Sequence, residues 1–544
     1  MNIIKNFKTP KPFIASIIIA CILVGYNIPI FIVTSSNTLF TDVCTLLILT
    51  TLTSVLVYLL SVNKLLVRII TIPLVLLSSA FLYFILFYKI KIYPPVITAI
   101  FETETTEAFE LLSLNLILWL SVFGLLPSYL ILKLTKNIHT SKKPRLILHA
   151  SLILIAIALY FNLGGSYTIS RAHAKSFKNS NPLLHPSYVF NKYLPFSYIY
   201  NTKLHLARSI NYITQKKKDI TAEHSFTLDT KKNKNSLFVL IIGESARSDR
   251  FSLNGYKKPT NPLLSKRKNV VSYTNSYSLG TSTMFAVPHI FIRDLKSKAP
   301  DEYKETSFLH VFKNLGFKTF WLSCYRSRRD SLIFDIALEA DTTAYGTHIA
   351  TYNSKNSSEA LLYDHALFEP LKETLEKNKN GIIILHTKGS HGNYYHRVPK
   401  GFHKFLPTCK NNCLNDKLAF NNSYDNTIFY TDFFLNEVLN ILKDKDAMFV
   451  YLSDHGESLG ENGVFAHSAP FETAPKEQTH IPMIWWASDK FLSNKENFEK
   501  FKQLQSNFDK PVDQSYIFHS ALDCMGVEST AINKKKSVCR KLSE

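Results

Sequence analysis

The chain has 544 residues, too many for one ordinary domain, so its length predicts two or three structural units. Hydrophobic residues make up 46% of the whole, but apolar stretches dominate before about residue 165 and the remainder has the composition of a soluble α/β protein. The formal net charge of +21 does not indicate nucleic-acid binding, because a basic domain outside a membrane faces anionic lipid headgroups; a generally basic proteome would explain it equally well.

Five apolar stretches in the first third of the chain are long enough to cross a bilayer, which takes about 20 residues of helix. The first lacks a small-residue cleavage site and is too long for a signal peptide, so we expect it to remain as an anchor. The third contains Arg68 close to its end, where a long side chain can reach the headgroups. The predicted spans lie near residues 13–33, 43–62, 65–88, 111–132 and 146–163.

Basic residues beside these spans predict the orientation of the chain. The N-terminal segment and the turns after the second and fourth spans are basic, whereas the loop after the first span has no positive charge. Positive charge favours the cytoplasmic side, so the N-terminus is expected in the cytoplasm and five crossings place the C-terminal part outside. In a bacterium this describes a multi-pass inner-membrane protein with its soluble part in the periplasm.

The composition divides the chain into three parts. Residues 1–163 are predicted to form the transmembrane domain, 164–235 an interfacial or periplasmic linker, and 236–544 the soluble catalytic domain. The linker alternates aromatic and basic residues, which suits the membrane interface, but a plain linker with a short packing helix explains the pattern equally well.

From residue 236 onward, short buried strands alternate with amphipathic helices. Four strands are clear from their uninterrupted apolar character, and the segments between them have apolar residues at three- and four-residue spacing. Strands that are apolar throughout and separated by helices predict an α/β fold with a mainly parallel sheet covered by helices on both faces. These strands cover residues 237–242, 319–323, 381–386 and 448–453.

Possible metal ligands follow three of these strands. Glu244 comes after the first, His391 after the third, and Asp454 and His455 directly after the fourth, with His467 further on. Ligands in parallel sheets bind beyond the carboxyl ends of the strands. A single histidine there is most often a surface or core residue, but two carboxylates and three histidines together favour zinc, and manganese or magnesium less well.

A cluster of hydroxyl groups supplies candidate nucleophiles. Thr281, Ser282 and Thr283 follow a glycine and precede a predicted helix. Such hydroxyls commonly cap the helix N-terminus, yet the same end of a helix steadies anions, and a nearby dication would lower the pKa of a hydroxyl. The spacing does not choose among the three residues.

The cysteines fit an oxidising compartment. Cys409 and Cys413 are close enough for a small disulfide loop, for which zinc–thiolate binding is a weaker alternative, and Cys524 with Cys539 forms a second possible pair. The remaining thiols are expected to be free: Cys21 and Cys44 lie in predicted spans, and Cys324 has no evident partner.

Six segments together resemble the phosphoethanolamine transferases, membrane-anchored members of the alkaline phosphatase and sulfatase superfamily that modify lipid A and other envelope acceptors. They run in that family's order through the soluble domain, and the five-span anchor ahead of them matches too. The segments are IGESARSDRFSLNGY (242–256), SLGTSTMFAVP (278–288), KGSHGNYYHR (388–397), NNSYDNTIFYTD (421–432), SDHGESLGENGVFAH (453–467) and APKEQTHIPMIWW (474–486).

This resemblance implies a role for each candidate residue. The family's nucleophilic threonine falls on Thr283, and the threonine would take phosphoethanolamine from phosphatidylethanolamine and pass it to lipid A, the lipopolysaccharide core or another envelope acceptor. The family's zinc ligands fall on Glu244, Thr283, Asp454 and His455. Its residues that bind the phosphoryl group or a second zinc fall on His391 and His467. Its residues that contact the substrate correspond to Thr103, Glu107 and Arg329.

Departures from the family pattern concern the acceptor and the binding of the headgroup more than the reaction. Leu279 and His289 stand where many relatives have a disulfide that brackets the nucleophile, and Ala99 stands where the colistin-resistance branch carries Asn. Two alternatives remain at this point: a phosphoglycerol transferase of the same superfamily, and a non-catalytic membrane sensor built on the same fold.

Overall fold

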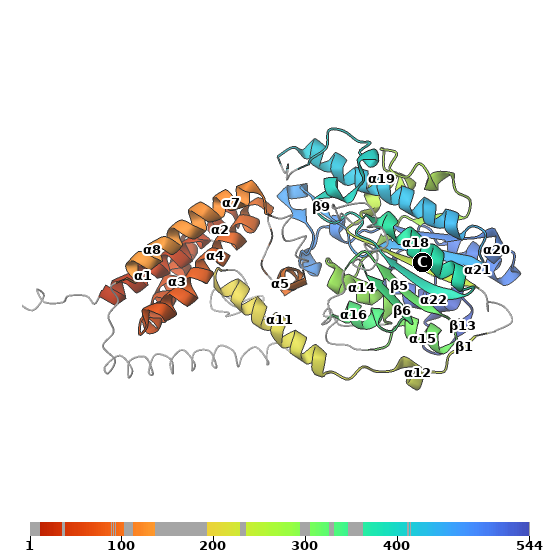
Figure 1. Ribbon diagram of the computed structural model, residues 1–544, viewed down its shortest axis with the longest axis horizontal. Helices are drawn as coiled ribbons and strands as arrows, with labels where there is room; N and C mark the ends of the chain where they lie inside the picture. Colours follow the sequence, from red (N-terminus) through yellow and green to blue (C-terminus); the bar gives the residue numbers. More distant parts are fainter. Residues whose placement is uncertain are drawn as a thin grey trace, which may run out of the picture. The chain divides into compact units, whose positions relative to one another are not determined.

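A computed structural model describes the chain in several ranges, and the contacts within the chain divide it into two compact units (Figure 1). Unit 1 consists of Met1–Ile97 and Ala108–His205, and unit 2 of Thr98–Glu107 and Leu206–Glu544. The described residues are 11–34, 39–88, 90, 92, 94–102, 112–136, 193–228, 236–293, 305–325, 331–345, 363–410, 413 and 415–542.

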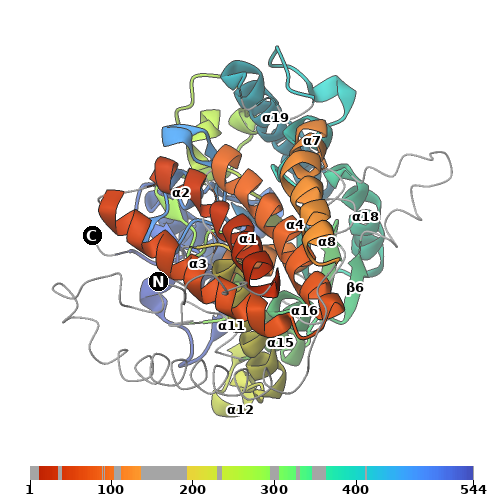
Figure 2. The ribbon, with the colours of Figure 1, turned by 90° about the vertical axis from the view of Figure 1, so that its left-hand side faces the viewer.

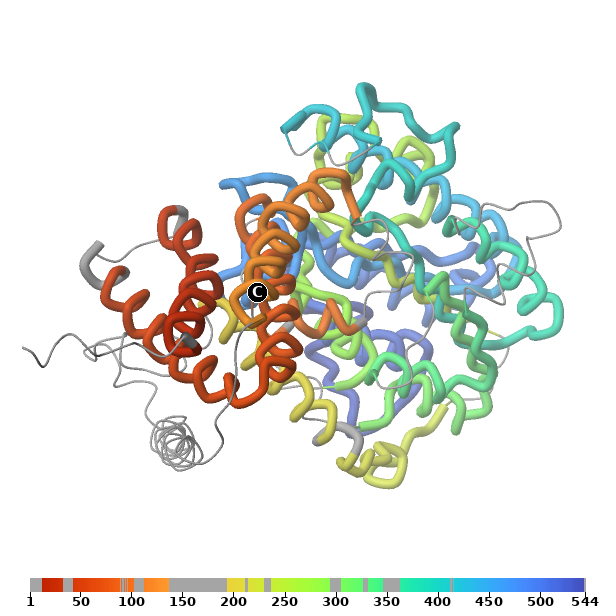
Figure 3. The backbone as a smooth tube through the Cα atoms, turned by 60° about the vertical axis from the view of Figure 1, so that its left-hand side comes forward, coloured from red at the N-terminus to blue at the C-terminus, as the bar shows by residue number. Residues whose placement is uncertain are grey.

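Within the described part of the chain, four helical segments are long and apolar enough to cross a membrane: Pro12–Ile32, Val43–Leu60, Lys64–Tyr88 and Leu114–Leu134. They match the first four predicted spans, and the fifth, 146–163, lies outside the described residues. Helices α1 and α3 run side by side, as do α4 and α8 (Figure 2, Figure 3). The helices of this region are α1 (Lys11–Gly25), α2 (Asn27–Thr34), α3 (Leu39–Leu60), α4 (Lys64–Tyr88), α5 (Pro94–Glu102), α7 (Leu114–Leu120), a π-helical turn (Ser121–Leu125) and α8 (Leu126–Leu134).

The first predicted span is divided into α1 and α2 at Tyr26. Pro29 lacks a backbone N–H and its ring clashes with the carbonyl four residues earlier, which breaks the helix here. Asn27 satisfies backbone groups at the break: its amide nitrogen donates to the Val24 and Leu194 carbonyls at 3.0 and 2.8 Å, and its oxygen accepts from the Leu194 N–H at 2.8 Å. The break is therefore stabilised by a fully paired buried amide.

Arg68 binds the end of a neighbouring helix. Its Nε donates to Thr135 Oγ1 at 2.7 Å and its Nη2 to the Leu132 carbonyl at 3.1 Å. A cation at a helix C-terminus satisfies orphan carbonyls and favours the helix dipole.

The predicted linker contains a long helix where the structure describes it. Helix α11 (Phe196–Thr214) begins on α4, where the Tyr198 hydroxyl donates to the Leu74 carbonyl at 3.1 Å. A short helix, α12 (Ile220–Glu223), follows. The described part of the segment thus contains a helix in contact with α4, while its role as an interfacial or plain linker stays a prediction.

The central sheet of unit 2 has seven strands among the described residues, in the order β3-β11-β8-β2-β7-β5-β6. The four predicted strands are its neighbouring members β8, β2, β7 and β5, and with β6 they are all parallel. Strand β11 is antiparallel to both of its neighbours, so the sheet is mixed. The bounds are β3 (Val270–Tyr273), β11 (Met483–Ala487), β8 (Ala447–Ser453), β2 (Leu237–Gly243), β7 (Gly381–His386), β5 (Thr319–Ser323) and β6 (Thr342–Tyr345).

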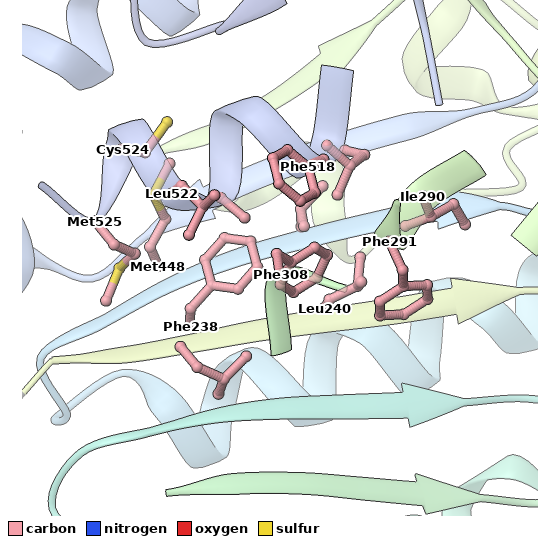
Figure 4. Packing of buried hydrophobic residues seen from close by; sticks show 14 of the residues in the cluster. Phe238, Leu240, Ile290, Phe291, Phe308, Met448, Phe518, Leu522, Cys524 and Met525 are labelled. Carbon is pink, nitrogen blue, oxygen red and sulfur yellow. The ribbon is translucent and has the colours of Figure 1, made fainter. Parts of the chain in front are cut away.

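Helices cover both faces of this sheet, because alternate residues of each buried strand point to opposite sides. On β2, Phe238 and Leu240 pack into one cluster with α14, α15 and α22, as Figure 4 shows, whereas Val239 and Ile241 pack with α18 and α19 on the other face. The helices of the first face are α14 (Thr283–Phe291), α15 (Phe308–Asn314), α16 (Leu332–Ala337), α20 (Asp489–Leu492), α21 (Lys495–Ser506) and α22 (Tyr516–Cys524); those of the second are α18 (Phe368–Lys377) and α19 (Lys417–Leu442).

Short strand pairs and disulfides complete unit 2. Both predicted disulfides, Cys409–Cys413 and Cys524–Cys539, are present, and Cys21, Cys44 and Cys324 are free thiols as expected. The two-residue strands pair as β1 (Thr227–Leu228) with β13 (Val527–Glu528), β4 (Ser276–Tyr277) with β12 (Val512–Asp513), and β9 (Ser458–Leu459) with β10 (Phe465–Ala466).

Candidate active site

The register of the central strands brings their following residues to one edge of the sheet. Gly243 at the end of β2 pairs with Ser453 at the end of β8, and Ile242 pairs with His386 at the end of β7. Neighbouring strands lie about 4.8 Å apart, so the residues that follow them become neighbours in space. Glu244 and Asp454 therefore lie side by side, and the N–H of the next residue, Ser245, donates to Asp454 Oδ1 across 209 positions of the sequence.

Glu244, Asp454 and His455 form a group in which one ligand atom of each residue lies within 4.8 Å of the others. His455 Nε2 is 3.4 Å from Glu244 Oε1 and 3.3 Å from Asp454 Oδ2. The other ring nitrogen, Nδ1, lies 2.8 Å from the Gly456 carbonyl oxygen and is its hydrogen-bond partner, which directs Nε2 at the two carboxylates. All three side chains are at most 1% exposed.

The two oxygens of Asp454 have different surroundings. Oδ1 accepts the N–H groups of Ser245 and His455 at 3.0 and 2.7 Å. Oδ2 is buried and has no hydrogen-bond donor among the described residues. A buried carboxylate oxygen without a donor is costly unless a cation satisfies it, and nitrogen and oxygen ligands without thiolate suit zinc. The residues present fit a divalent metal ion.

Burial dominates the electrostatics of this group. Burial and the neighbouring carboxylate of Asp454 raise the pKa of Glu244 to about 7. Burial likewise raises the pKa of Asp454 to about 6 and lowers the pKa of His455 to about 4. Each of the three side chains is thus held towards its neutral form by the protein alone, and a bound cation would reverse that preference for the carboxylates.

Close backbone contacts surround this group of side chains. Gly389 has a φ of +45°, and a Cβ there would lie 2.9 Å from both the backbone nitrogen and oxygen of Glu244. A Cβ on Gly456 would lie 2.0 Å from the Glu477 carbonyl oxygen. Ser245 is in the left-handed region with a φ of 55°, a conformation that costs a non-glycine residue about 1 kcal/mol or more. The chain accepts this strain where it positions Glu244.

The three candidate hydroxyls have different partners. Thr283, the first residue of α14, donates from Oγ1 to Glu244 Oε2 at 3.1 Å and lies 3.5 Å from His455 Nε2. Thr281 Oγ1 instead donates to the Ala469 carbonyl at 2.6 Å. Ser282 is the N-cap residue, but its side chain makes no capping bond. Thr283 is the hydroxyl that the fold places against the acidic group.

The two further histidines lie beside this group. The rings of His455 and His467 are 4.2 Å apart between centroids, and those of His391 and His467 are 6.1 Å apart. His467 is flanked by Ala466 and Ser468, both with positive φ, of 63° and 70°. The Nδ1 atom of His391 is buried and has no partner in the part of the chain that the structure describes. The fold thus brings both histidines to the same edge of the sheet.

Glu457 orients one of these histidines. Its Oε1 lies 3.3 Å from His467 Nδ1, and its side chain is 1% exposed. Burial alone would lower the pKa of His467, but the negative charges of Glu457, Glu244 and Asp454 outweigh it and raise that pKa to about 9. Burial lowers the pKa of His391 well below its usual value, and the positive charge of Arg397 adds to this effect. The surroundings of the two imidazoles therefore shift their pKa values in opposite directions.

Residues that the sequence analysis did not single out support the site. Asp364 accepts the N–H groups of Lys388 and Gly389 at 2.6 and 3.1 Å and so holds the loop that follows β7. Tyr325, just after β5, donates from its hydroxyl to Glu244 Oε2 at 3.2 Å. Asp364 lies in a segment with helical periodicity, which gives no indication of a role at the site. Tyr325 follows a predicted strand, and this position could have indicated that it lies near the site.

The proposed substrate contacts Thr103, Glu107 and Arg329 lie outside the described residues. Ala99 lies in α5. Leu279 and His289 have no thiol group and therefore form no disulfide at these positions. Burial lowers the pKa of His289 to about 4.

Both the N-terminal and the C-terminal part of the chain match known protein families. The sulfatase family matches residues 236–527, and the family described as phosphoethanolamine transferase EptA/EptB matches residues 49–210. Phosphoethanolamine transferase EptA of Escherichia coli K12 is 31% identical over 494 residues, covering 86% of this chain and 85% of its own length. The chain belongs to the phosphoethanolamine transferases.

Two further relatives describe the breadth of the likeness. The Kdo(2)-lipid A phosphoethanolamine 7''-transferase of E. coli K12 is 29% identical over 493 residues, covering 87% of this chain and 85% of its own length. The integral membrane phosphoethanolamine transferase EptA of Neisseria meningitidis superposes with a TM-score of 0.76 at 23% identity, over 96% of this chain and 98% of its own. This phosphoethanolamine transferase therefore shares the fold of the meningococcal protein.

Proposed function

We propose that this protein transfers phosphoethanolamine from phosphatidylethanolamine to an envelope acceptor, a phosphate of lipid A or the lipopolysaccharide core, through a covalent intermediate on Thr283. The observation that carries the proposal is the hydrogen bond from Thr283 Oγ1 to Glu244 Oε2, 3.1 Å long, within a buried group of two carboxylates and an imidazole. The acceptor follows the names of the relatives, which include a Kdo(2)-lipid A transferase.

Zinc is the metal that this donor set favours. Glu244, Asp454 and His455, with the hydroxyl of Thr283, would hold one ion, which when bound supplies positive charge that neutralises phosphate oxygens and favours ionisation of the threonine. His391 and His467 would bind the phosphoryl group or a second zinc ion. The orphaned Oδ2 of Asp454 supports the first of these sites.

The residues then divide the reaction into two displacements. In the first, Thr283 Oγ1 bonds to the phosphorus, its proton leaves along the hydrogen bond to Glu244, and the bond from phosphorus to the diacylglycerol oxygen breaks. The leaving oxygen takes up a proton from His467, the imidazole whose pKa is raised. In the second, the acceptor oxygen gives its proton back to the imidazole and bonds to phosphorus, and Thr283 leaves and recovers its proton.

Two features of the chain suit lipid substrates. The N-terminus of α14, a nine-residue helix that begins at Thr283, favours a negative group beside the nucleophile. The apolar helices of unit 1 would hold the enzyme in the inner membrane, with residues 236–544 as the catalytic domain in the periplasm, so that enzyme, donor and acceptor share one surface. Thr103, Glu107 and Arg329 would contact the donor headgroup.

Mass spectrometry of lipid A tests the function directly. Cells that express the wild-type protein should show lipid A with one added phosphoethanolamine, and cells with Thr283→Ala should not, because the covalent step has no nucleophile. The variant activity should fall by at least about 1000-fold. Thr283→Ser, which keeps a hydroxyl, should retain part of it.

Two results would contradict the proposal. An added mass of phosphoglycerol in place of phosphoethanolamine would identify the other transferase class. Undiminished modification by Thr283→Ala, at equal protein level in the membrane, would show that Thr283 is not the nucleophile.

A further inference from the structure

Tyr325 occupies the edge of the sheet next to the proposed phosphoryl site. It follows β5, and the N–H of the preceding residue, Cys324, donates to the His386 carbonyl at 2.9 Å, which continues the pairing of β5 with β7. The Tyr325 N–H donates to Ser323 Oγ at 3.1 Å, and its ring lies 4.9 Å from the His386 ring. These contacts hold Tyr325 beside the ends of β5 and β7, at the edge where the site residues gather.

The Tyr325 hydroxyl and the Thr283 hydroxyl donate to the same oxygen. Their distances to Glu244 Oε2 are 3.2 and 3.1 Å. Both hydroxyls therefore meet at a single acceptor atom. A phosphoryl group attached to Thr283 would carry its non-bridging oxygens into the space around that nucleophile, beside the oxygen to which Tyr325 donates.

The surroundings of Tyr325 suit contact with a negative group. The residue is only partly buried, whereas the Glu244 carboxylate that it meets is 1% exposed. Lys388 Nζ lies 5.6 Å from the centre of its ring, so a positive charge stands beside the phenol. A hydroxyl in this position can give its hydrogen bond to a phosphoryl oxygen when one is present.

We infer that Tyr325 is a further catalytic residue, whose hydroxyl donates a hydrogen bond to a non-bridging oxygen of the phosphoryl group during both displacements. Negative charge on those oxygens in the transition state strengthens such a bond, and pre-positioned donors of this kind act in phosphoryl transfer. Tyr325 transfers no proton and forms no bond to phosphorus. The inference rests on the proposed function, because it requires the phosphoryl group to be carried by Thr283.

A purely structural role predicts different behaviour. If Tyr325 only oriented Glu244, its removal would weaken metal binding, since partners of metal ligands contribute about 10- to 100-fold to affinity. If it touches the phosphoryl group, its removal slows transfer and leaves the metal content unchanged. The two roles can therefore be separated by measuring zinc content and kinetics on the same preparation.

The test uses the zinc-loaded full-length enzyme in lipid nanodiscs that contain phosphatidylethanolamine, with Tyr325→Phe as the variant. We expect kcat to fall about 10- to 100-fold, with zinc content, Tm and KM for the donor unchanged. Tyr273→Phe is the matched control, because the buried Tyr273 hydroxyl donates to the Leu504 carbonyl at 2.8 Å, a structural contact with no proposed catalytic group. The control should keep the wild-type kcat.

A donor with sulfur in place of one non-bridging oxygen sharpens the test. Sulfur accepts a hydrogen bond poorly, so one diastereomer should slow the wild-type enzyme through the contact with Tyr325. That effect should shrink in Tyr325→Phe, which has already lost the contact, because coupled changes are not additive. A structural role would leave the effect of sulfur equal in both enzymes.

Three outcomes would overturn the inference: a kcat of Tyr325→Phe within twofold of wild type, a loss of zinc that parallels the loss of activity, or equal sulfur effects in the two enzymes for both diastereomers. Failure of the inference is distinct from failure of the proposed function. In the first case the wild type transfers phosphoethanolamine and Thr283→Ala does not, and in the second the wild type itself transfers none.

Discussion

Unit 2 contains two sets of carboxylates that are equally buried but differ in their partners. We call Asp425 the paired set, and Glu244 with Asp454 the unpaired set. Asp425 is 0% exposed and lies among donors from its own chain: Lys258 Nζ at 2.7 Å, the Tyr256 hydroxyl at 2.9 Å and Arg250 Nη1 at 3.2 Å. Glu244 and Asp454 are as deeply buried, but no lysine or arginine among the described residues forms an ion pair with either.

The difference separates a structural role from a functional one. A buried charge is stable only when it is paired or binds a metal, and the Asp425 carboxylate is paired with two cations of the protein. The carboxylates of Glu244 and Asp454 are instead held towards the neutral form, with pKa values raised to about 7 and about 6 by burial. In the proposed function, a bound metal ion supplies the positive charge that these two carboxylates lack.

The largest effect is expected when the unpaired set is broken. Asp454→Asn keeps the shape of the side chain but removes the negative charge, so zinc affinity should fall by at least about 100-fold and transfer should be lost with it. Measuring zinc content by plasma mass spectrometry beside transfer to lipid A checks this. Asp425→Asn, at equal burial, is the control and should keep its zinc.

A variant that keeps full zinc and full activity would show that Asp454 is not a ligand. Stability gives an independent readout. The metal-free Asp454→Asn variant should be no less stable than the metal-free wild type, because it removes a buried carboxyl group that has no cationic partner.

The second-largest effect is a loss of stability, and it is expected when the paired set is broken. Asp425→Asn leaves Arg250 and Lys258 without their carboxylate, and breaking a buried pair in this way costs about 3 kcal/mol. Chemical denaturation followed by circular dichroism should show that loss in the free energy of unfolding. An unchanged free energy of unfolding would contradict the structural role assigned to Asp425, whatever happens to zinc content.

The sequence predicted that the candidate ligands would lie close together, because these residues follow strands. Strands 319–323 and 381–386 form with the bounds expected, and the edge rule for parallel sheets then places Glu244, Asp454 and His455 together. The order of the strands in the sheet and the antiparallel direction of β11 could not be read from local patterns, because both depend on pairing between distant segments.

Other details were beyond local patterns for the same reason. Thr283 could not be distinguished from Thr281 by spacing, since their different partners, Glu244 and the Ala469 carbonyl, come from remote segments. The contact of Asn27 with Leu194 joins residues 167 positions apart. Residues 146–163, with Thr103, Glu107 and Arg329, stay predictions.

The smallest effect concerns a third carboxylate and its pH dependence. Asp523 accepts from Arg540 Nε at 2.9 Å and from Ser537 Oγ at 2.6 Å, beside the Cys524–Cys539 disulfide. Burial would raise the pKa of Asp523, but the hydrogen bonds and charge of Arg540 outweigh it and lower that pKa below its usual value. Arg540 is 38% exposed, so solvent screens the pair and the gain in stability is modest.

The sign of this effect follows from proton binding. With its pKa lowered in the folded state, Asp523 binds fewer protons when folded than when unfolded, so its contribution is present above about pH 4 and is lost as the pH falls through the folded pKa. Thermal unfolding of wild type and Asp523→Asn should therefore differ near neutral pH and converge in acid. Asp432 makes the opposite control: burial raises its pKa to about 6, and the N–H groups of Leu263 and Leu264, which donate to it, offset that rise only in part. The contribution of Asp432 to stability is lost as the pH rises from about 4 through 6. The stability of Asp432→Asn relative to wild type should therefore increase over that interval. If Asp523→Asn and Asp432→Asn responded to pH in parallel, the pKa directions assigned to both carboxylates would be refuted.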